Sequence, residues 1–161
     1  MADTRESTTN SVQLQLSLPA TAEAPRRVRR AVDAEPDLAD PDLLFLLRLL
    51  LTELVTNAVK HAGLREDERV DVLVEAREGV VSVRVSDRGT GPASLPPRPD
   101  PSHTSGRGLL LVTAIADRWG LEVAGGTAVW FELDLDQAGR PAHFAASLRR
   151  AAEASSRGRV G

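Results

Sequence analysis

The stretch LLTELVTNAVKHAG, residues 50–63, decides how this chain folds. It closes a segment, residues 43–62, that is almost entirely apolar, as expected for a helix buried against a core. Within it, Glu53, Asn57 and His61 are spaced four apart and Lys60 lies three after Asn57, so all four share one helix face. Unpaired polar groups cost several kcal/mol to bury. We therefore interpret this polar stripe (Glu53, Asn57, Lys60 and His61) as a candidate binding site.

Length and composition indicate a single soluble domain. A chain of 161 residues with 42% hydrophobic and 27% charged residues can bury one core. Its net charge of −3 gives no basic footprint for nucleic acid, and it has no cysteine for a disulfide or thiolate metal site. The polar N-terminus lacks the apolar segment of a signal peptide, and no apolar run approaches the ~20 residues of a membrane helix. We expect a cytoplasmic protein that contacts neither nucleic acid directly nor a membrane.

Hydrophobic periodicity outlines one folded unit between two polar ends. Residues 1–10 are interpreted as a flexible tail, residues 11–136 as the folded domain, and residues 137–161 as a second tail with a short helix at 142–152. Alternating apolar residues predict strands, and apolar residues at helical spacing predict helices. The predicted strands are 11–18, 70–76, 80–86, 121–123 and 127–135, and the predicted helices are 21–32, 41–61 and 108–119.

The order of these elements predicts the fold class. Tight turns between consecutive strands favour antiparallel or mixed pairing, and helices that come in blocks favour one layer on one face of the sheet. We therefore predict an α+β fold, a two-layer α/β sandwich with a mixed, mostly antiparallel sheet and helices on one face. Residues 87–105 contain five prolines and no apolar periodicity, which is typical of a long loop that serves as a lid.

A glycine-containing motif directly follows one predicted strand. Asp87 ends that strand, and Gly89 and Gly91 allow the backbone to turn sharply and to approach a flat ligand closely. An ionised carboxylate only accepts hydrogen bonds, so Asp87 is suited to hold an exocyclic amine. The motif predicts a pocket for a planar group that carries such an amine.

A second glycine motif, Gly106-Arg107-Gly108, opens the predicted helix at 108–119. The first N–H groups of a helix are unpaired and attract anions, of which phosphate is the usual one. On the polar stripe, Asn57 offers a neutral carbonyl oxygen of the kind that Mg²⁺ accepts together with water. These two features predict a site for a phosphate group with its metal ion.

Together, the motifs resemble the ATP-binding fold shared by gyrase B, Hsp90, histidine kinases and MutL. ELVTNAVKH at 53–61 is similar to the N box of that superfamily, DRGTG at 87–91 to its first glycine box, and GRGLLLV at 106–112 to its second. Within the superfamily the chain looks most like the small anti-sigma-factor serine kinases of partner-switching systems, and GGTAVWFEL at 125–133 also looks like theirs. The resemblance covers roughly residues 12–135.

The resemblance implies roles for the polar stripe in handling the phosphates. Glu53 would be the general base that takes the proton from a substrate serine, and Asn57 would ligate Mg²⁺. Lys60 and His61 would lie near the phosphates. The chain has no GxxxxGK sequence followed by Ser or Thr, which excludes P-loop chemistry.

The resemblance also implies roles for the glycine motifs. Asp87 would bind the adenine amine, with Gly89 and Gly91 shaping the pocket and Thr127 backing it. The three residues Gly106, Arg107 and Gly108 would hold the triphosphate from the lid. The cofactors implied are ATP and Mg²⁺.

Three functions compete at this point. The first is a protein-serine kinase that sequesters a sigma factor and phosphorylates an anti-anti-sigma antagonist; dimers are common in this group, so a homodimer is open. The second is a binding module that captures partners with nucleotide or without it and transfers no phosphate, because Leu109–Leu111 stand where a third glycine can occur elsewhere in the superfamily. The third is a stand-alone histidine kinase catalytic domain, which would need a partner, because no histidine precedes His61.

Overall fold

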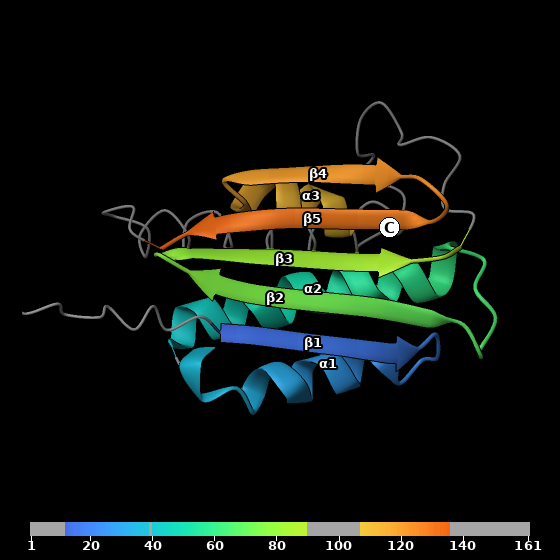
Figure 1. Ribbon diagram of the computed structural model, residues 1–161, viewed down its shortest axis with the longest axis horizontal. Coiled ribbons are helices and arrows are strands. Elements are labelled where there is room, and N and C mark those ends of the chain that lie inside the picture. Colours follow the sequence, from blue (N-terminus) through green and yellow to red (C-terminus); the bar gives the residue numbers. More distant parts are fainter. Residues whose placement is uncertain (1–11, 39, 90–106, 136–161) are drawn as a thin grey trace, which may run out of the picture.

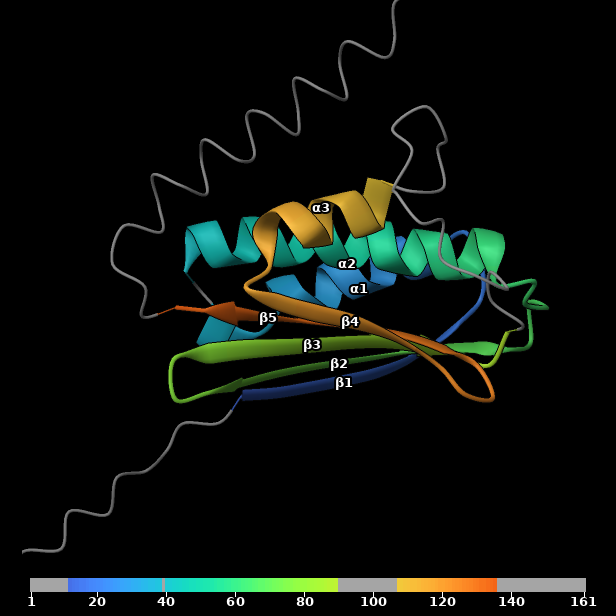
Figure 2. The same ribbon diagram turned by 90° about the horizontal axis from the view of Figure 1, so that it is seen from above.

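The computed structural model describes residues 12–38, 40–89 and 107–135, drawn in colour in Figure 1. In these ranges the chain forms a five-stranded sheet with three α-helices and one short 3₁₀ helix. The elements are β1 (Val12–Pro19), α1 (Ala24–Asp33), η1 (Pro36–Leu38), α2 (Pro41–His61), β2 (Arg69–Arg77), β3 (Val80–Asp87), α3 (Arg107–Ile115), β4 (Arg118–Val123) and β5 (Thr127–Asp134). The three α-helices lie on one face of the sheet (Figure 2), which confirms the predicted two-layer α+β sandwich.

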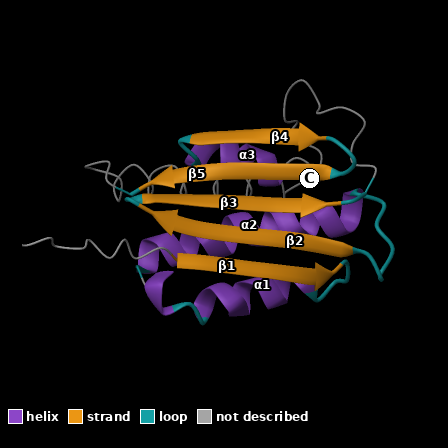
Figure 3. Cartoon of the chain, in the orientation of Figure 1, coloured by secondary structure: helices purple, strands orange, loops and turns teal. Residues whose placement is uncertain are grey.

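Strand order brings distant parts of the sequence together. The sheet runs β1-β2-β3-β5-β4, so β5 is inserted between β3 and the edge strand β4 (Figure 3). All four pairings among the described strands are antiparallel, whereas the sequence left a mixed sheet open. In the β3–β5 register the last residue of β3, Asp87, is paired with the first residue of β5, Thr127.

The core forms between the helices and the inner face of the sheet. Alternate residues of β2 and β3 are buried there, and Phe131 and Leu133 of β5 are fully buried beside them. Each such side chain contributes about 1.5–3 kcal/mol when it leaves water. None of the described residues is a buried polar or charged residue, so the polar side chains of this part are at least partly exposed.

Helix α2 spans the length of this layer and starts and ends where the sequence predicts. Asp40 caps it, its side chain accepting a hydrogen bond from the Leu43 N–H at 2.8 Å, and Pro41 occupies the first turn. Ala62 forms the C-cap, and Gly63 follows with φ +67°, a conformation that glycine adopts easily. The helix buries Leu47, Leu50, Leu51 and Val55 completely.

Three predicted boundaries are wrong, and one of them is the start of the strand predicted at 121–123, which begins at Arg118. The predicted helix at 108–119 ends at Ile115, because residues 118–123 form β4 and Trp119 pairs with Phe131 of β5. The apolar spacing of Trp119 fits a helix and a half-buried strand equally well, so the sequence pattern could not separate them. The predicted helix at 21–32 begins only at Ala24. Most of the predicted loop at 87–105 and the predicted helix at 142–152 lie outside the described residues.

Candidate functional site

The polar stripe of α2 runs from a half-buried end to an exposed end. Glu53 and Asn57 are half-buried, and Lys60, one turn further along, is exposed. His61 is the last residue of α2, and its side chain is outside the described part. The buried residues of α2 lie on the other face of the helix, so the polar side chains of the stripe point away from the core. The predicted shared face is therefore confirmed for Glu53, Asn57 and Lys60.

Helix α3 packs its first turn directly on this stripe. A Cβ atom added at Gly108 would lie 2.6 Å from Asn57 Nδ2 and 3.4 Å from Glu53 Cβ, so a larger residue there would force the Asn57 carboxamide to move. Val112 and Ile115, further along α3, are buried and anchor the helix in the core. Figure 2 shows α3 beside α2. The second glycine motif thus meets the stripe, as the sequence predicts, although Gly106 and the Arg107 side chain lie outside the described part.

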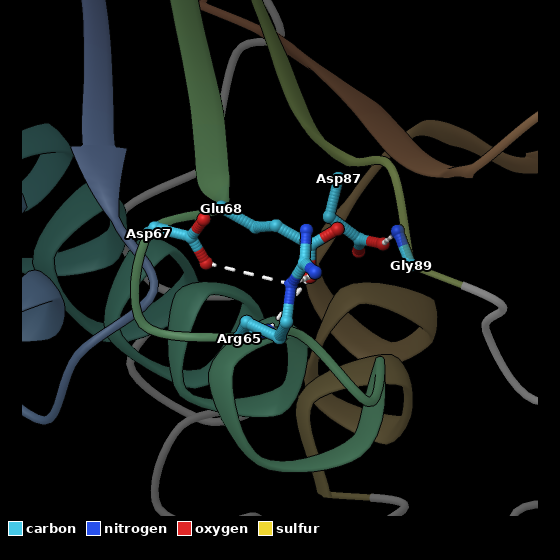
Figure 4. A network of polar contacts seen from close by, with 5 residues as sticks. All are labelled: Arg65, Asp67, Glu68, Asp87 and Gly89. Carbon is cyan, nitrogen blue, oxygen red and sulfur yellow. Dashed lines mark hydrogen bonds and ion pairs between the residues drawn. The ribbon is translucent and has the colours of Figure 1, made fainter.

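The last residue of β3, Asp87, presents a carboxylate that the turn after the strand holds in place. Asp87 Oδ1 accepts a hydrogen bond from the Gly89 N–H at 2.9 Å, drawn in Figure 4. Burial raises the pKa of Asp87 above its usual range, and the bond from Gly89 opposes part of that shift. Within the described residues, Oδ2 of Asp87 has no hydrogen-bond partner. One oxygen is therefore fixed by the backbone, and the other can accept from a ligand.

The same turn packs against the end of α2. A Cβ atom at Gly89 would lie 2.2 Å from the Ala62 carbonyl oxygen and 2.7 Å from Ala62 Cβ, so a larger residue would displace the turn. This contact fixes the Asp87 turn against the C-terminal end of α2. Gly91, the other glycine of the motif, is outside the described residues.

Thr127 supplies a second hydrogen-bonding group beside Asp87. Its Oγ1 atom is buried and, within the described residues, has no hydrogen-bond partner. Such atoms are rare in folded proteins, and an absent ligand or water is a common reason. Asp87 and Thr127 are paired across the sheet, and by strand alternation both face the helix layer. Two cross-strand neighbours thus each carry a side-chain oxygen that has no partner within the described residues.

The loop between α2 and β2 is held by its own ion pairs. The Nε atom of Arg65 lies 3.5 Å from Asp67 Oδ1 and 4.0 Å from Glu68 Oε2. The backbone N–H of Arg65 also donates to Glu68 Oε2 at 2.7 Å (Figure 4). These groups are largely exposed, so each pair contributes only about 0–1 kcal/mol. The described residues contain no group of three or more His, Cys, Asp or Glu side chains able to hold a metal ion by themselves.

Sequence reasoning missed one residue of this site. A Cβ atom at Gly126, in the turn between β4 and β5, would lie 2.2 Å from the carbonyl oxygen of Asp87. Gly126 stands directly before Thr127 in the motif at 125–133, and this position is the sequence signal that could have indicated it. Its contact with Asp87, however, depends on the order of the strands in the sheet.

The fold and this arrangement define a nucleotide-binding domain of the ATPase type. A family model described as the histidine kinase-like ATPase domain matches residues 17–133. The chain belongs to this family, and the matched span includes the α2 stripe, Asp87, α3 and Thr127. Membership of an ATPase domain family implies that the chain binds ATP. No curated protein sequence matches the chain.

No helix of the described part combines the length and the apolar character needed to cross a membrane.

Proposed function

We propose that this chain is an ATP- and Mg²⁺-dependent protein-serine kinase that acts as an anti-sigma factor in the cytoplasm. Its substrate would be a serine of an anti-anti-sigma antagonist, and phosphorylation would change which partner the chain holds. One observation carries the nucleotide part of this proposal: within the described residues, Asp87 keeps one carboxylate oxygen without a partner, and its cross-strand neighbour Thr127 has a buried hydroxyl without one. The proposed protein partners rest on the resemblance of the three sequence motifs to those of the small anti-sigma-factor serine kinases.

The Asp87 end of the site fits an adenine ring. Adenine has an exocyclic amine that donates and ring nitrogens that accept. Asp87 Oδ2 can take the amine hydrogen bond, and the Thr127 hydroxyl can donate to a ring nitrogen directly or through a water. Because Asp87 is partly removed from water, a hydrogen bond to its carboxylate is stronger than it would be at the surface. The pair therefore supports recognition of a base with an amino group.

The α2–α3 end fits the phosphates and their metal ion. Asn57 turns Nδ2 toward the backbone of α3, which leaves Oδ1 as the atom able to ligate Mg²⁺. A bound Mg²⁺ would neutralise phosphate charge and complete its shell with phosphate and water oxygens. The positive N-terminal end of α3 adds charge of the right sign there, and Lys60, exposed on the same helix face as Asn57, can bring an ammonium to the phosphates.

Glu53 is the residue proposed to act as general base. It lies one helical turn before Asn57, on the same face, and is half-buried. As the serine oxygen forms its bond to the γ-phosphorus, the serine proton passes to the Glu53 carboxylate, and the bond from γ-phosphorus to the bridging oxygen of ADP breaks. Position and charge neutralisation are the main demands of phosphoryl transfer, and the α2 face supplies both.

A comparison of two glutamates tests the proposal. The full chain is mixed with Mg²⁺ and γ-labelled ATP and with the antagonist recovered from a pull-down in ATP and Mg²⁺. We expect Glu53→Gln to lower phosphate transfer by about 10²–10⁴-fold with ATP affinity nearly kept. Glu66, exposed in the loop after α2, provides the control, and Glu66→Gln should transfer at the wild-type rate. Equal transfer by Glu53→Gln and wild type would show that the base is assigned wrongly.

The same experiment distinguishes the partner-capture function. Helix α3 runs without interruption from Arg107 through Leu109–Leu111, where another superfamily member can have a third glycine. If ATP raises the melting temperature of wild type but no antagonist is phosphorylated, the chain works by nucleotide-dependent capture. If ATP neither binds nor stabilises it, both nucleotide-dependent functions are wrong.

A further inference from the structure

The turn between β4 and β5 contains two adjacent glycines with different surroundings. Gly125 has φ +67° and Gly126 has φ +152°, both conformations that residues with side chains rarely adopt. The Ala124 N–H donates to the Gly126 carbonyl oxygen at 3.2 Å within this turn. A Cβ atom at Gly125 would meet nothing within 4 Å. Turn conformation alone therefore accounts for Gly125.

Gly126, in contrast, lies against the residue that faces the ligand. A Cβ atom there would lie 2.2 Å from the Asp87 carbonyl oxygen, 3.2 Å from the Asp87 carbonyl carbon and 3.1 Å from Arg88 Cα. All three are backbone atoms, so no flexible side chain can move aside to relieve the contact. Any residue larger than glycine must displace the backbone that carries the Asp87 carboxylate.

The Asp87 turn has little room to accept such a displacement. Its far end, at Gly89, is in close backbone contact with Ala62 at the end of α2. The Gly89 N–H also fixes Asp87 Oδ1 at 2.9 Å, so a shift of the turn moves donor and carboxylate together. A hydrogen bond weakens steeply with misplacement, so a small shift is enough to change what Oδ2 can accept.

We propose that Gly126 is a positioning residue for base recognition: its contact with the Asp87 backbone sets where the carboxylate stands, and thereby makes the site select a purine with a 6-amino group. This inference rests on the proposed ATP-binding function and deepens it. Gly126 acts through Asp87 and touches no ligand itself.

The two glycines of the turn provide a matched test. The full chain is titrated calorimetrically with ATP and with purine riboside triphosphate, which lacks only the 6-amino group. Wild type should prefer ATP by at least about tenfold, the size expected for a hydrogen bond to a charged acceptor. Gly126→Ala should lose most of this preference through weaker ATP binding, with affinity for the analogue nearly unchanged. Gly125→Ala also places a side chain at positive φ in the same turn, with a milder strain and no atom within 4 Å, and should keep the preference.

The possible outcomes distinguish a failure of the positioning role of Gly126 from a failure of the proposed ATP-binding function. If Gly126→Ala is folded and keeps the wild-type preference, or if Gly125→Ala loses it equally, the positioning role is wrong. If wild type binds neither triphosphate, the proposed function itself fails. Should Gly126→Ala not fold, Gly126→Asn takes its place, because asparagine tolerates positive φ better than alanine and also adds a Cβ atom. That variant should also lose the preference, and a retained preference would overturn the inference.

Discussion

The two ends of the candidate site are built in different ways. At the Asp87 end, strand register and backbone contacts fix the groups: Thr127 is paired with Asp87, and Gly89 and Gly126 pack against neighbouring backbone. At the α2 end, Glu53 and Asn57 project from one helix, and Gly108 of α3 lies against them. The geometry of the Asp87 end is fixed by backbone contacts before a ligand binds. The α2 end consists of side chains that project from a single helix. We therefore expect base recognition to be more sensitive to small changes than phosphate handling.

The largest effect in this comparison should come from Asp87→Asn. The amide keeps the size of the side chain but replaces one acceptor with a donor and removes the charge. We expect ATP affinity to fall by about 10- to 100-fold, the loss of one charge-assisted hydrogen bond. Calorimetric titration with ATP measures it. Asp71→Asn, at an exposed position of β2, is the control and should bind like wild type; an unchanged affinity for Asp87→Asn would remove Asp87 from the binding site.

Sequence alone predicts the parts of the site that depend on local pattern. Helical spacing places Glu53 and Asn57 on one face, and the capping sequence at Asp40 defines where α2 begins. Asp87 is found because a carboxylate followed by glycines at a strand end is unusual. These features are encoded within a few residues of one another, so one sequence is enough.

The remaining features depend on contacts between distant segments. Nothing local predicts that β5 inserts between β3 and β4, which is what pairs Thr127 with Asp87 and brings Gly126 onto its backbone. The end of α3 was also misjudged, because Trp119 fits either periodicity until its partner Phe131 is known. The base end of the site, built by register, was therefore harder to predict than the α2 end.

Gly108→Ala should have the next largest effect, at the α2 end. The added methyl group would crowd Asn57 Nδ2 and turn the carboxamide or lift the first turn of α3. We expect affinity for Mg²⁺–ATP to fall by about tenfold, since one turned metal ligand loses roughly one good interaction. Affinity for adenosine, which has no phosphate, should stay within about twofold, because the Asp87 end is untouched. A parallel loss for both ligands in calorimetry would contradict a separate phosphate end.

A smaller effect is expected from Thr127→Val, which replaces a hydroxyl with a methyl group of similar size. The buried Oγ1 atom has no described partner, so its removal should stabilise the ligand-free chain by about 1 kcal/mol. ATP affinity should fall by about three- to tenfold, the loss of one neutral hydrogen bond. Urea unfolding and calorimetry measure the two quantities. The control is Thr113→Val in α3, because the exposed Thr113 hydroxyl already donates to the Leu109 carbonyl oxygen at 2.8 Å; it should leave ATP affinity unchanged.

The smallest effect concerns the stability of the ligand-free chain and acid pH. The folded-state pKa of Asp87 is raised, mainly by burial, so the folded chain holds this proton to a higher pH than the unfolded chain. The folded state then binds more protons, and the contribution of Asp87 to stability falls as pH rises from the ordinary value of 3.8 through the raised one. At neutral pH, Asp87→Asn should therefore melt slightly above wild type, although it binds ATP worse.

Melting curves of Asp87→Asn and wild type from pH 3 to pH 7 measure this difference. It should shrink toward acid, where Asp87 is protonated in both states of the wild-type chain. Because the carboxylate is only partly buried, water screens much of the penalty, and a shift of one or two degrees is about the most we expect. A wild-type chain that is the more stable of the two at neutral pH would mean that the Gly89 N–H bond outweighs burial. In that case the Gly89 hydrogen bond would compensate the unfavourable burial of the carboxylate in the ligand-free chain. A ligand would not be needed to offset that burial.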